Sequence, residues 1–463
     1  MQITKSDVVW NYGATFLKIA SSVLLFPSIL KMMPAEKVGI WSIFMTITAF
    51  AGLLDLGFSS SFTRNVTYVF SGVNNLKING FEFVSTKDQN ANYGLLKAVI
   101  TAMRWFYLRM AIILFLFLST FGTYYIYTLL INYKGEKQEI YIAWALLCAI
   151  STYNLFTLYY DALLQGKGLV KRSKQIVIVG QTVYLAIATI LILYGFGLVA
   201  IVSAQASSVI IIRWLSYNSF FTREIKQKLL GAIARSQKEI LKAIYPNALK
   251  IGLTTLGGFM VQRSSIIIGS LYLTLEDIGS YGITIQLIAV LSSLAGIYTA
   301  TYQPMMTNLR INNSNSEIKK LYLKGQIIMV ITFIFGGTGM LFLGEWALNF
   351  IGSQTKLMSF SIILIALLVS MLETNLSIAG NILLTKNIVP FFKASLLSGF
   401  CIVLGLVLGF NFTNLGLYIM VLVPLIVDLL YSAWKWPLEV IKELEITADD
   451  YYLALKNFIG IGG

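Results

Sequence analysis

The sequence predicts an all-α, polytopic membrane protein with about twelve transmembrane helices in two lobes of six helices each. Three observations lead to this fold class. The 463 residues are 57% hydrophobic and only 12% charged, whereas about 25% of the residues of a soluble protein are charged. Uncharged stretches long enough to cross a bilayer recur along the chain. Finally, Lys and Arg gather in alternate segments between these stretches.

Apolar stretches near the length of a membrane crossing predict twelve spans. They cover residues 8–30, 38–62, 107–131, 140–162, 175–194, 197–217, 243–270, 278–304, 325–344, 357–379, 389–410 and 414–436. Residues 175–212 carry no charge over 38 positions, and as one helix they would extend about 57 Å, which is too long for one crossing. We therefore divide this stretch at 195–197 (Gly-Phe-Gly), and residues 394–427 likewise at 411–414.

The distribution of Lys and Arg predicts how the spans are oriented, because cytoplasmic loops are enriched in these residues. With a cytoplasmic N-terminus, 26 of the 35 Lys and Arg residues fall in inner segments, counting Arg213, Lys393 and Lys435 at the inner ends of their spans, and five fall in outer loops. The remaining four lie within spans. This asymmetry predicts an even number of spans, with the N- and C-termini both in the cytoplasm.

Two sequence echoes indicate that the chain consists of two parallel halves. Residues 36–41 (Glu-Lys-Val-Gly-Ile-Trp) match residues 276–281 (Glu-Asp-Ile-Gly-Ser-Tyr) at an offset of 240. Asn11 and Asn247, near the start of the first span of each half, lie at an offset of 236. Parallel repeats place a substrate cavity between two lobes.

These halves predict the domain limits. We expect an N-terminal lobe at 1–219, a cytoplasmic basic linker helix at 220–242, a C-terminal lobe at 243–436 and a cytoplasmic tail at 437–463. The linker pattern suits a helix on the anionic inner leaflet, and a solvated linker is the alternative interpretation.

Composition excludes several kinds of site. The chain contains no His, which excludes His-based zinc sites, Ser-His-Asp triads and imidazole catalysis. Cys148 and Cys401 lie in apolar runs without metal-ligand spacing. The chain also lacks the Gly-x-x-x-x-Gly-Lys-Ser/Thr motif of nucleotide-binding P-loops. We therefore expect no metal, no nucleotide and no cofactor other than a coupling H⁺ or Na⁺.

Cations within the predicted spans are the candidate substrate ligands. Lys18 lies in the first span, Lys250 and Arg263 lie in the seventh, and Arg64 closes the inner end of the second. A charge at the bilayer centre is costly, so such groups usually face a cavity or a partner. Cations from both halves favour an anionic substrate such as a phosphate. Snorkelling or internal ion pairs are the alternative.

Acids and prolines within the spans are candidates for coupling and for hinges. Asp55, Glu373 and Asp428 could exchange a proton or hold Na⁺, and balancing the intramembrane cations is the alternative role. Pro27 and Pro246 interrupt the first helix of each half, where they would act as hinges or as static kinks.

The start of the chain resembles that of bacterial O-antigen and polysaccharide flippases. The resemblance is carried by residues 26–30 (Phe-Pro-Ser-Ile-Leu), 36–41, 53–58 (Leu-Leu-Asp-Leu-Gly-Phe) and Arg64. These Wzx-like flippases form one superfamily with the MATE multidrug exporters and the lipid II flippases. The motifs cover only the first part of the chain, and the twelve-span plan extends the resemblance to the rest.

The resemblance implies a MATE-like pair of six-helix lobes that work by alternating access. It implies transport of undecaprenyl-pyrophosphate-linked oligosaccharide, such as an O-antigen repeat unit for lipopolysaccharide, across the bacterial inner membrane from the inner to the outer leaflet. Lys18, Lys250 and Arg263 would line the family's cationic cavity, and Asp55, Glu373 and Asp428 would couple transport to H⁺ or Na⁺. The expected partners are this glycan lipid, membrane lipids and polysaccharide assembly proteins, without nucleic acid.

Two other functions stay open, and each would need sequence features that differ from those described above. A MATE-like, cation-coupled multidrug exporter would place acids rather than bases in its cavity, because its cargo is usually cationic. A membrane glycan polymerase or ligase would be an enzyme and would need a large external loop, whereas the predicted external loops are short.

Overall fold

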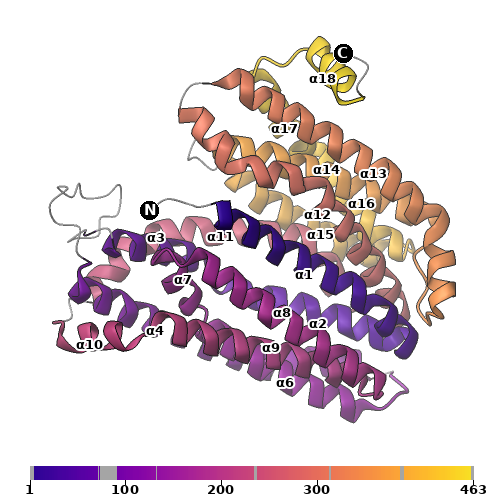
Figure 1. The fold of residues 1–463 in the computed structure, drawn as a ribbon. Coiled ribbons are helices and arrows are strands. Elements are labelled where there is room, and N and C mark those ends of the chain that lie inside the picture. Colours follow the sequence, from indigo (N-terminus) through magenta and orange to yellow (C-terminus); the bar gives the residue numbers. More distant parts are fainter. Residues whose placement is uncertain are drawn as a thin grey trace. The chain divides into compact units, whose positions relative to one another are not determined.

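The computed structural model describes residues 5–70, 72, 91–131, 133–233, 237–311, 314–385 and 390–459, and within these ranges every regular element is a helix (Figure 1). The first helices are α1 (Lys5–Met32), α2 (Ala35–Leu53), α3 (Phe58–Phe70), α4 (Tyr93–Phe117), α5 (Thr123–Leu129), α6 (Lys137–Phe156), α7 (Tyr159–Gly166), α8 (Val170–Leu193), α9 (Gly197–Phe220) and α10 (Arg223–Gly231). The later ones are α11 (Gln237–Gly269), α12 (Leu275–Ile311), α13 (Asn315–Ile351), α14 (Phe360–Leu384), α15 (Phe392–Phe412), α16 (Leu417–Val427), α17 (Ala433–Glu443) and α18 (Ala448–Ile459). Two π-helical turns, Leu118–Gly122 and Asp428–Ser432, join α4 to α5 and α16 to α17.

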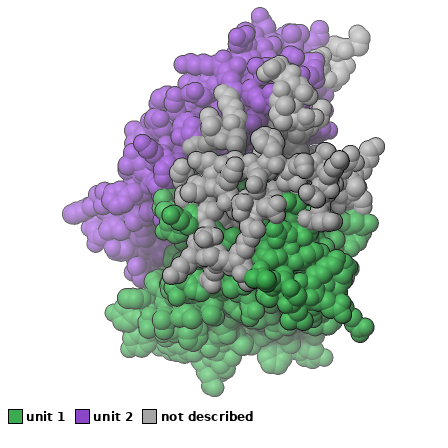
Figure 2. All heavy atoms as spheres, turned by 90° about the vertical axis from the view of Figure 1, so that its left-hand side faces the viewer, with its two compact units in different colours: residues 1–33, 44–255 green, residues 34–43, 256–463 purple. Residues whose placement is uncertain are grey.

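The helices form two compact units, coloured separately in Figure 2. Unit 1 comprises residues 1–33 and 44–255, and unit 2 comprises residues 34–43 and 256–463. In unit 1, α8 packs against α1 and α9, α6 packs against α4 and α9, and α3 packs against α7. In unit 2, α12, α13 and α14 pack against one another, and α14 also contacts α16 and α17. The predicted limits of the lobes and of the linker stay predictions.

Nine helical segments among the described residues are long and apolar enough to cross a membrane. They are Tyr93–Leu129, Lys137–Gly166, Val170–Leu193, Gly197–Phe220, Leu275–Ala300, Asn315–Ile351, Phe360–Leu384, Phe392–Phe412 and Leu417–Glu443. At most 50% of any of these apolar windows is buried inside the protein, so much apolar surface faces outward and requires lipid rather than water. The other predicted spans fall in α1, in α2 with α3, and in α11; the total of twelve and the cytoplasmic termini stay predictions.

The division of the long uncharged stretch at 195–197 is confirmed. Helix α8 ends at Leu193 and α9 begins at Gly197, and Gly195 and Gly197 have φ values of +82° and +51°. These angles lie in the left-handed region that glycine adopts readily. The backbone N–H of Leu198 donates to Glu139 Oε1 at 2.8 Å, so a carboxylate from α6 satisfies one free donor at the start of α9.

The second predicted span, 38–62, is not one continuous helix. It is broken at residues 54–57, between α2 and α3, where Leu56 and Gly57 have φ values of +47° and +69°. Left-handed backbone at two successive positions ends a right-handed helix. Because this turn contains Asp55, it creates the first of the two sites described below.

The repeated motif brings two helix starts into direct backbone contact within unit 2. A Cβ atom at Gly39 of α2 would overlap the carbonyl oxygen of Leu275, and one at Gly279 of α12 would lie 2.5 Å from the carbonyl oxygen of Ala35. The relation is reciprocal, since a Cβ atom at either glycine would lie 3.2 Å from the backbone nitrogen of the other. Only glycine allows helices to cross this closely, which explains why the motif carries it in both halves.

Candidate functional site

Asp55 builds the junction between α2 and α3 through its carboxylate. The backbone N–H of Ser59 donates to Asp55 Oδ1 at 3.0 Å and to Oδ2 at 3.2 Å. The hydroxyl of Tyr107, a fully buried residue of α4, donates to Oδ1 at 2.5 Å. The carboxylate therefore caps one free donor at the start of α3 and also fixes α3 to α4.

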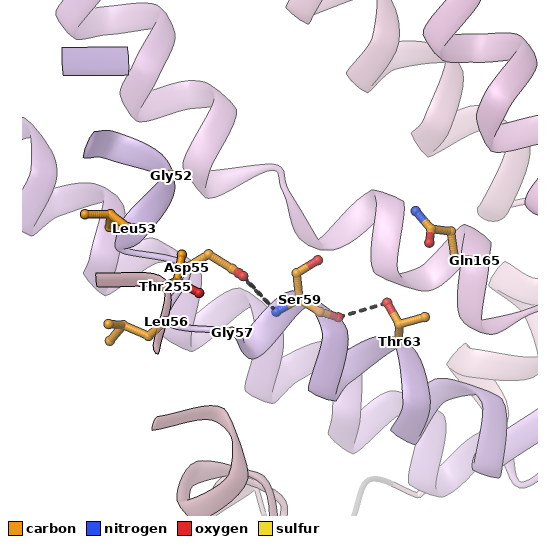
Figure 3. A pocket seen from close by; sticks show the side chains of 9 residues that line it. All are labelled: Gly52, Leu53, Asp55, Leu56, Gly57, Ser59, Thr63, Gln165 and Thr255. Carbon is orange, nitrogen blue, oxygen red and sulfur yellow. Dashed lines mark hydrogen bonds between the residues drawn. The ribbon is translucent and has the colours of Figure 1, made fainter. Parts of the chain in front are cut away.

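A cavity of about 450 Å³ opens at this junction within unit 1. Its lining residues are Gly52, Leu53, Asp55, Leu56, Gly57, Ser59, Thr63, Gln165 and Thr255. Figure 3 shows Asp55 in the turn before α3, Ser59 and Thr63 on α3, and Gln165 on α7, the helix that packs against α3. The lining thus combines one carboxylate with hydroxyl and amide groups.

A buried ion pair lies elsewhere in unit 1. Arg213 of α9 is only 5% exposed, and its guanidinium donates to Asp161 Oδ2 at 2.6 Å and to Asn154 Oδ1 at 2.7 Å. The charge distribution of the sequence placed Arg213 on the cytoplasmic side and did not reveal this pair. Asp161, an acid at the inner end of a predicted span, was the available signal. A buried charge with these partners ties α7 and α6 to α9.

Unit 2 contains a second cavity, of about 260 Å³, which brings together two of the predicted coupling acids. Glu373 comes from α14 and Asp428 from the π-helical turn after α16. The remaining polar lining is neutral: Gln262, Ser377, Asn381, Ser395, Ser398 and Ser432. Asp428 is 3% exposed, and its Oδ2 atom has no hydrogen-bond partner among the described residues. Within the same ranges neither acid forms a salt bridge.

The position of Asp428 follows from an irregular helix. Pro424 lacks the N–H that would bond to the carbonyl of Met420, and the hydroxyl of Ser265 on α11 donates to that carbonyl instead, at 3.0 Å. The π-helical turn Asp428–Ser432 follows directly. Such turns concentrate at functional sites because they rotate side chains out of the regular helical register.

The four predicted cationic ligands differ in their surroundings and in whether the structure describes their side chains. Arg263 on α11 is half-buried, lies near the buried Tyr281 together with Glu373, and has no hydrogen-bond or ion-pair partner in the described ranges. Arg64 is exposed on α3. Lys18 belongs to α1 and Lys250 to α11, but the side chains of both lie outside the described part of the structure. The binding roles of all four stay predictions.

The structure places one of the two predicted hinge prolines, and its described residues can be searched for metal-ligand groups. Pro27 is half-buried inside α1, which continues to Met32, and the side chain of Pro246 in α11 lies outside the described residues. Among the residues that the structure describes, no group of three or more Cys, Asp or Glu side chains could hold a metal ion.

Comparisons with known proteins establish the fold. No family model and no curated protein matches the sequence. An inward-facing MATE multidrug transporter of the MOP superfamily matches with a TM-score of 0.64 at 16% identity, over 94% of this chain and 96% of the other. An outward-facing MATE transporter gives a TM-score of 0.57 at 15% identity, over 96% of this chain and 100% of the other. The lipid II flippase MurJ in an inward closed conformation gives 0.59 at 14% identity, over 96% of this chain and 90% of the other.

These similarities, with the nine apolar helices, confirm the predicted all-α, MATE-like fold class. At this level of identity they establish the fold alone. The chain is a multi-pass membrane protein with the fold shared by MATE transporters and the MurJ flippase.

Proposed function

We propose that this protein is a flippase of the bacterial cytoplasmic membrane. Its proposed cargo is an undecaprenyl-pyrophosphate-linked oligosaccharide, such as an O-antigen repeat unit, which it moves from the inner to the outer leaflet. A transporter role is supported by the fold, because the matching structures are MATE transporters and a lipid II flippase.

The observation that carries the choice of cargo is Arg263. This guanidinium lies half-buried in a predicted span without an acidic partner among the described residues. An unpaired cation in such surroundings is costly and marks a site for an anion. A guanidinium binds pyrophosphate oxygens through paired hydrogen bonds, and Lys18 and Lys250 on the first helices of the two halves would add to this charge.

Glu373 and Asp428 support coupling of transport to H⁺ or Na⁺. Two carboxylates that share a cavity, and that form no ion pair among the described residues, favour uptake of a cation. A cation that binds one conformation better than another shifts the population toward that conformation by its difference in affinity. Alternate binding of the cation and the glycan lipid would then drive alternating access.

A MATE-like multidrug exporter is the second candidate, and a specific observation favours it. Among the described residues, the charged groups that line the unit 2 cavity are two acids, which would also attract a cationic drug. The two functions differ in the role of Arg263: it binds the glycan lipid in the first and would repel the cargo in the second.

Surface-glycan display tests the proposal. In cells whose own gene is deleted, Arg263→Ala and Lys250→Ala should abolish surface glycan while the protein remains in the membrane. Arg109→Ala is the matched control, because Arg109 also lies in a predicted span but is exposed and stacks over Trp105 at 3.8 Å. Normal glycan in both test variants would remove the assigned binding role.

A further inference from the structure

The unit 1 cavity has no role in the function proposed above, but its size is typical of a binding site for a small molecule. At about 450 Å³ it lies within the range of small-molecule sites, about 300–1,000 Å³. The position of Gly52 adds open room, because a Cβ atom there would meet no heavy atom within 4 Å. The cavity is therefore large for a single ion and suitable for a small organic group.

The charges around the cavity exclude two ligand classes. None of its described lining residues is Lys or Arg, so nothing there balances a phosphate. Asp55 is the charged residue of the lining, and both of its carboxylate oxygens already accept hydrogen bonds, from Ser59 and Tyr107. These three hydrogen bonds leave about one of the four acceptor sites of the carboxylate free, which is room for one further donor but not for the several oxygen contacts that a metal cation needs.

The remaining lining groups suit a ligand that is rich in hydroxyl groups. The side-chain amide of Gln165 has no hydrogen-bond partner among the described residues, so it can donate twice and also accept. The hydroxyl of Thr63 donates to the carbonyl of Ser59 at 2.8 Å, which leaves its own oxygen free to accept. The Asp55 carboxylate retains acceptor capacity beyond its present bonds. Together these groups can receive and donate hydrogen bonds at several points of a polyhydroxylated ring.

We propose that this cavity binds one sugar residue of the glycan headgroup. Gln165 and Thr63 hydrogen-bond to sugar hydroxyls, Asp55 accepts from another, and the pyrophosphate is held elsewhere by the cations. The inference rests on the proposed function and assigns the sugar and the pyrophosphate to different parts of the molecule.

Binding measurements on the purified full-length protein in nanodiscs test this assignment. The probes are undecaprenyl pyrophosphate that carries the repeat unit of the source cell, and undecaprenyl pyrophosphate without sugar. Gln165→Leu and Thr63→Val should each weaken binding of the glycan lipid about 3- to 10-fold, the usual effect of losing one hydrogen bond. Binding of the sugar-free lipid should not change.

Two substitutions serve as matched controls. Thr67→Val removes an equivalent hydroxyl one turn later on α3. The Thr67 hydroxyl donates to the carbonyl of Thr63, just as the Thr63 hydroxyl donates to the carbonyl of Ser59. Gln181→Leu removes a half-buried amide on α8 that does not line the cavity. Both controls should bind the two lipids as the wild type does.

The outcomes separate this inference from the proposed function. Unchanged glycan-lipid binding in Gln165→Leu and Thr63→Val, or an equal loss for both lipids, overturns the sugar site. If Arg263→Ala still weakens both lipids in that case, the proposed function stands alone. If the wild type binds neither lipid, the proposed function fails and the sugar site fails with it.

Discussion

Asp55 in unit 1 and the pair Glu373 and Asp428 in unit 2 are similar in sequence but differ in structure. All three are acids in apolar segments. The Asp55 carboxylate accepts hydrogen bonds from a helix start and from a buried tyrosine. Glu373 and Asp428 share a cavity, and among the described residues no hydrogen bond or ion pair satisfies their carboxylates. An acid in an apolar segment can therefore hold a helix junction together or remain without a protein partner, and the structure distinguishes these two cases.

The largest expected effect comes from the unpartnered pair. Glu373→Gln and Asp428→Asn keep the side-chain shape but remove the charge, so cation-driven transport in proteoliposomes should fall about 10-fold or more. The thermal unfolding temperature should hold or rise, because an unpaired buried charge is removed. Glu345→Gln, at an exposed position of α13, is the control. Unchanged gradient dependence in both variants would remove the coupling role of this cavity.

Substitution of Asp55 should lower stability, in contrast to substitution of Glu373 or Asp428. Asp55→Ala removes the cap of α3 and leaves Tyr107 without its acceptor, which should lower the free energy of unfolding by about 2–4 kcal/mol. Asp55→Asn should lower the free energy of unfolding by a smaller amount, because its amide oxygen can still accept the hydrogen bond from Ser59. Thermal unfolding in detergent measures both. If Asp55→Asn is stable yet transport no longer follows the cation gradient, the coupling role predicted for Asp55 is supported, and the contrast with unit 2 is wrong.

A third test separates carboxylate chemistry from helix packing. Gly39→Ala should displace the start of α2 from α12 and destabilise this contact by about 1–3 kcal/mol, because the added Cβ overlaps Leu275. A cysteine placed at the buried Ser42, with Cys148 and Cys401 replaced, should then react faster with a thiol reagent. Gly296→Ala on α12, where a Cβ meets nothing within 4 Å, should leave the rate unchanged. Equal rates in both variants would mean that the helices tolerate the methyl group.

Asp450 extends the comparison to an acid outside the predicted spans, with the smallest expected effect. Ion pairing with Lys319 of α13, helped by hydrogen bonds from Thr447, lowers the pKa of Asp450 to about 2. Its contribution to holding α18 on α13 is therefore complete above the ordinary pKa of an aspartate and is lost as the pH falls through about 2.

Limited proteolysis measures this attachment. Asp450→Asn should speed trypsin cleavage at Lys456 modestly at neutral pH, while the wild type should show no change in α18 attachment, followed spectroscopically, between about pH 7 and pH 5. A loss of attachment near pH 5 would contradict the lowered pKa.

Much of the fold could be predicted from the sequence because its signals are local. The uncharged run at 175–212 is too long for one crossing, and Gly195 and Gly197 mark where it turns. The repeat of the 36–41 pattern at 276–281 identified Gly39 and Gly279, which face each other in the structure. Apolar length and glycine position are properties of short windows, so one sequence is enough to read them.

The sites depend on contacts that no short window contains. At the break at 54–57, the Asp55 carboxylate accepts a hydrogen bond from Tyr107, which is 52 residues away. Asp161 and Arg213 are likewise 52 residues apart. The sequence predicted the same coupling role for Asp55, Glu373 and Asp428, which stays a prediction. Polarity within an apolar run does not reveal which of these carboxylates find hydrogen-bond donors.

Reconstitution tests the proposed transport most directly. Purified protein in proteoliposomes would be given the undecaprenyl-pyrophosphate-linked repeat unit or the cationic dye ethidium, under an imposed H⁺ or Na⁺ gradient. We expect the glycan lipid to change leaflets with the gradient in the wild type, to stay in place with Arg263→Ala, and the dye not to move. Gradient-driven transport of ethidium without movement of the glycan lipid would contradict the flippase and identify a drug exporter.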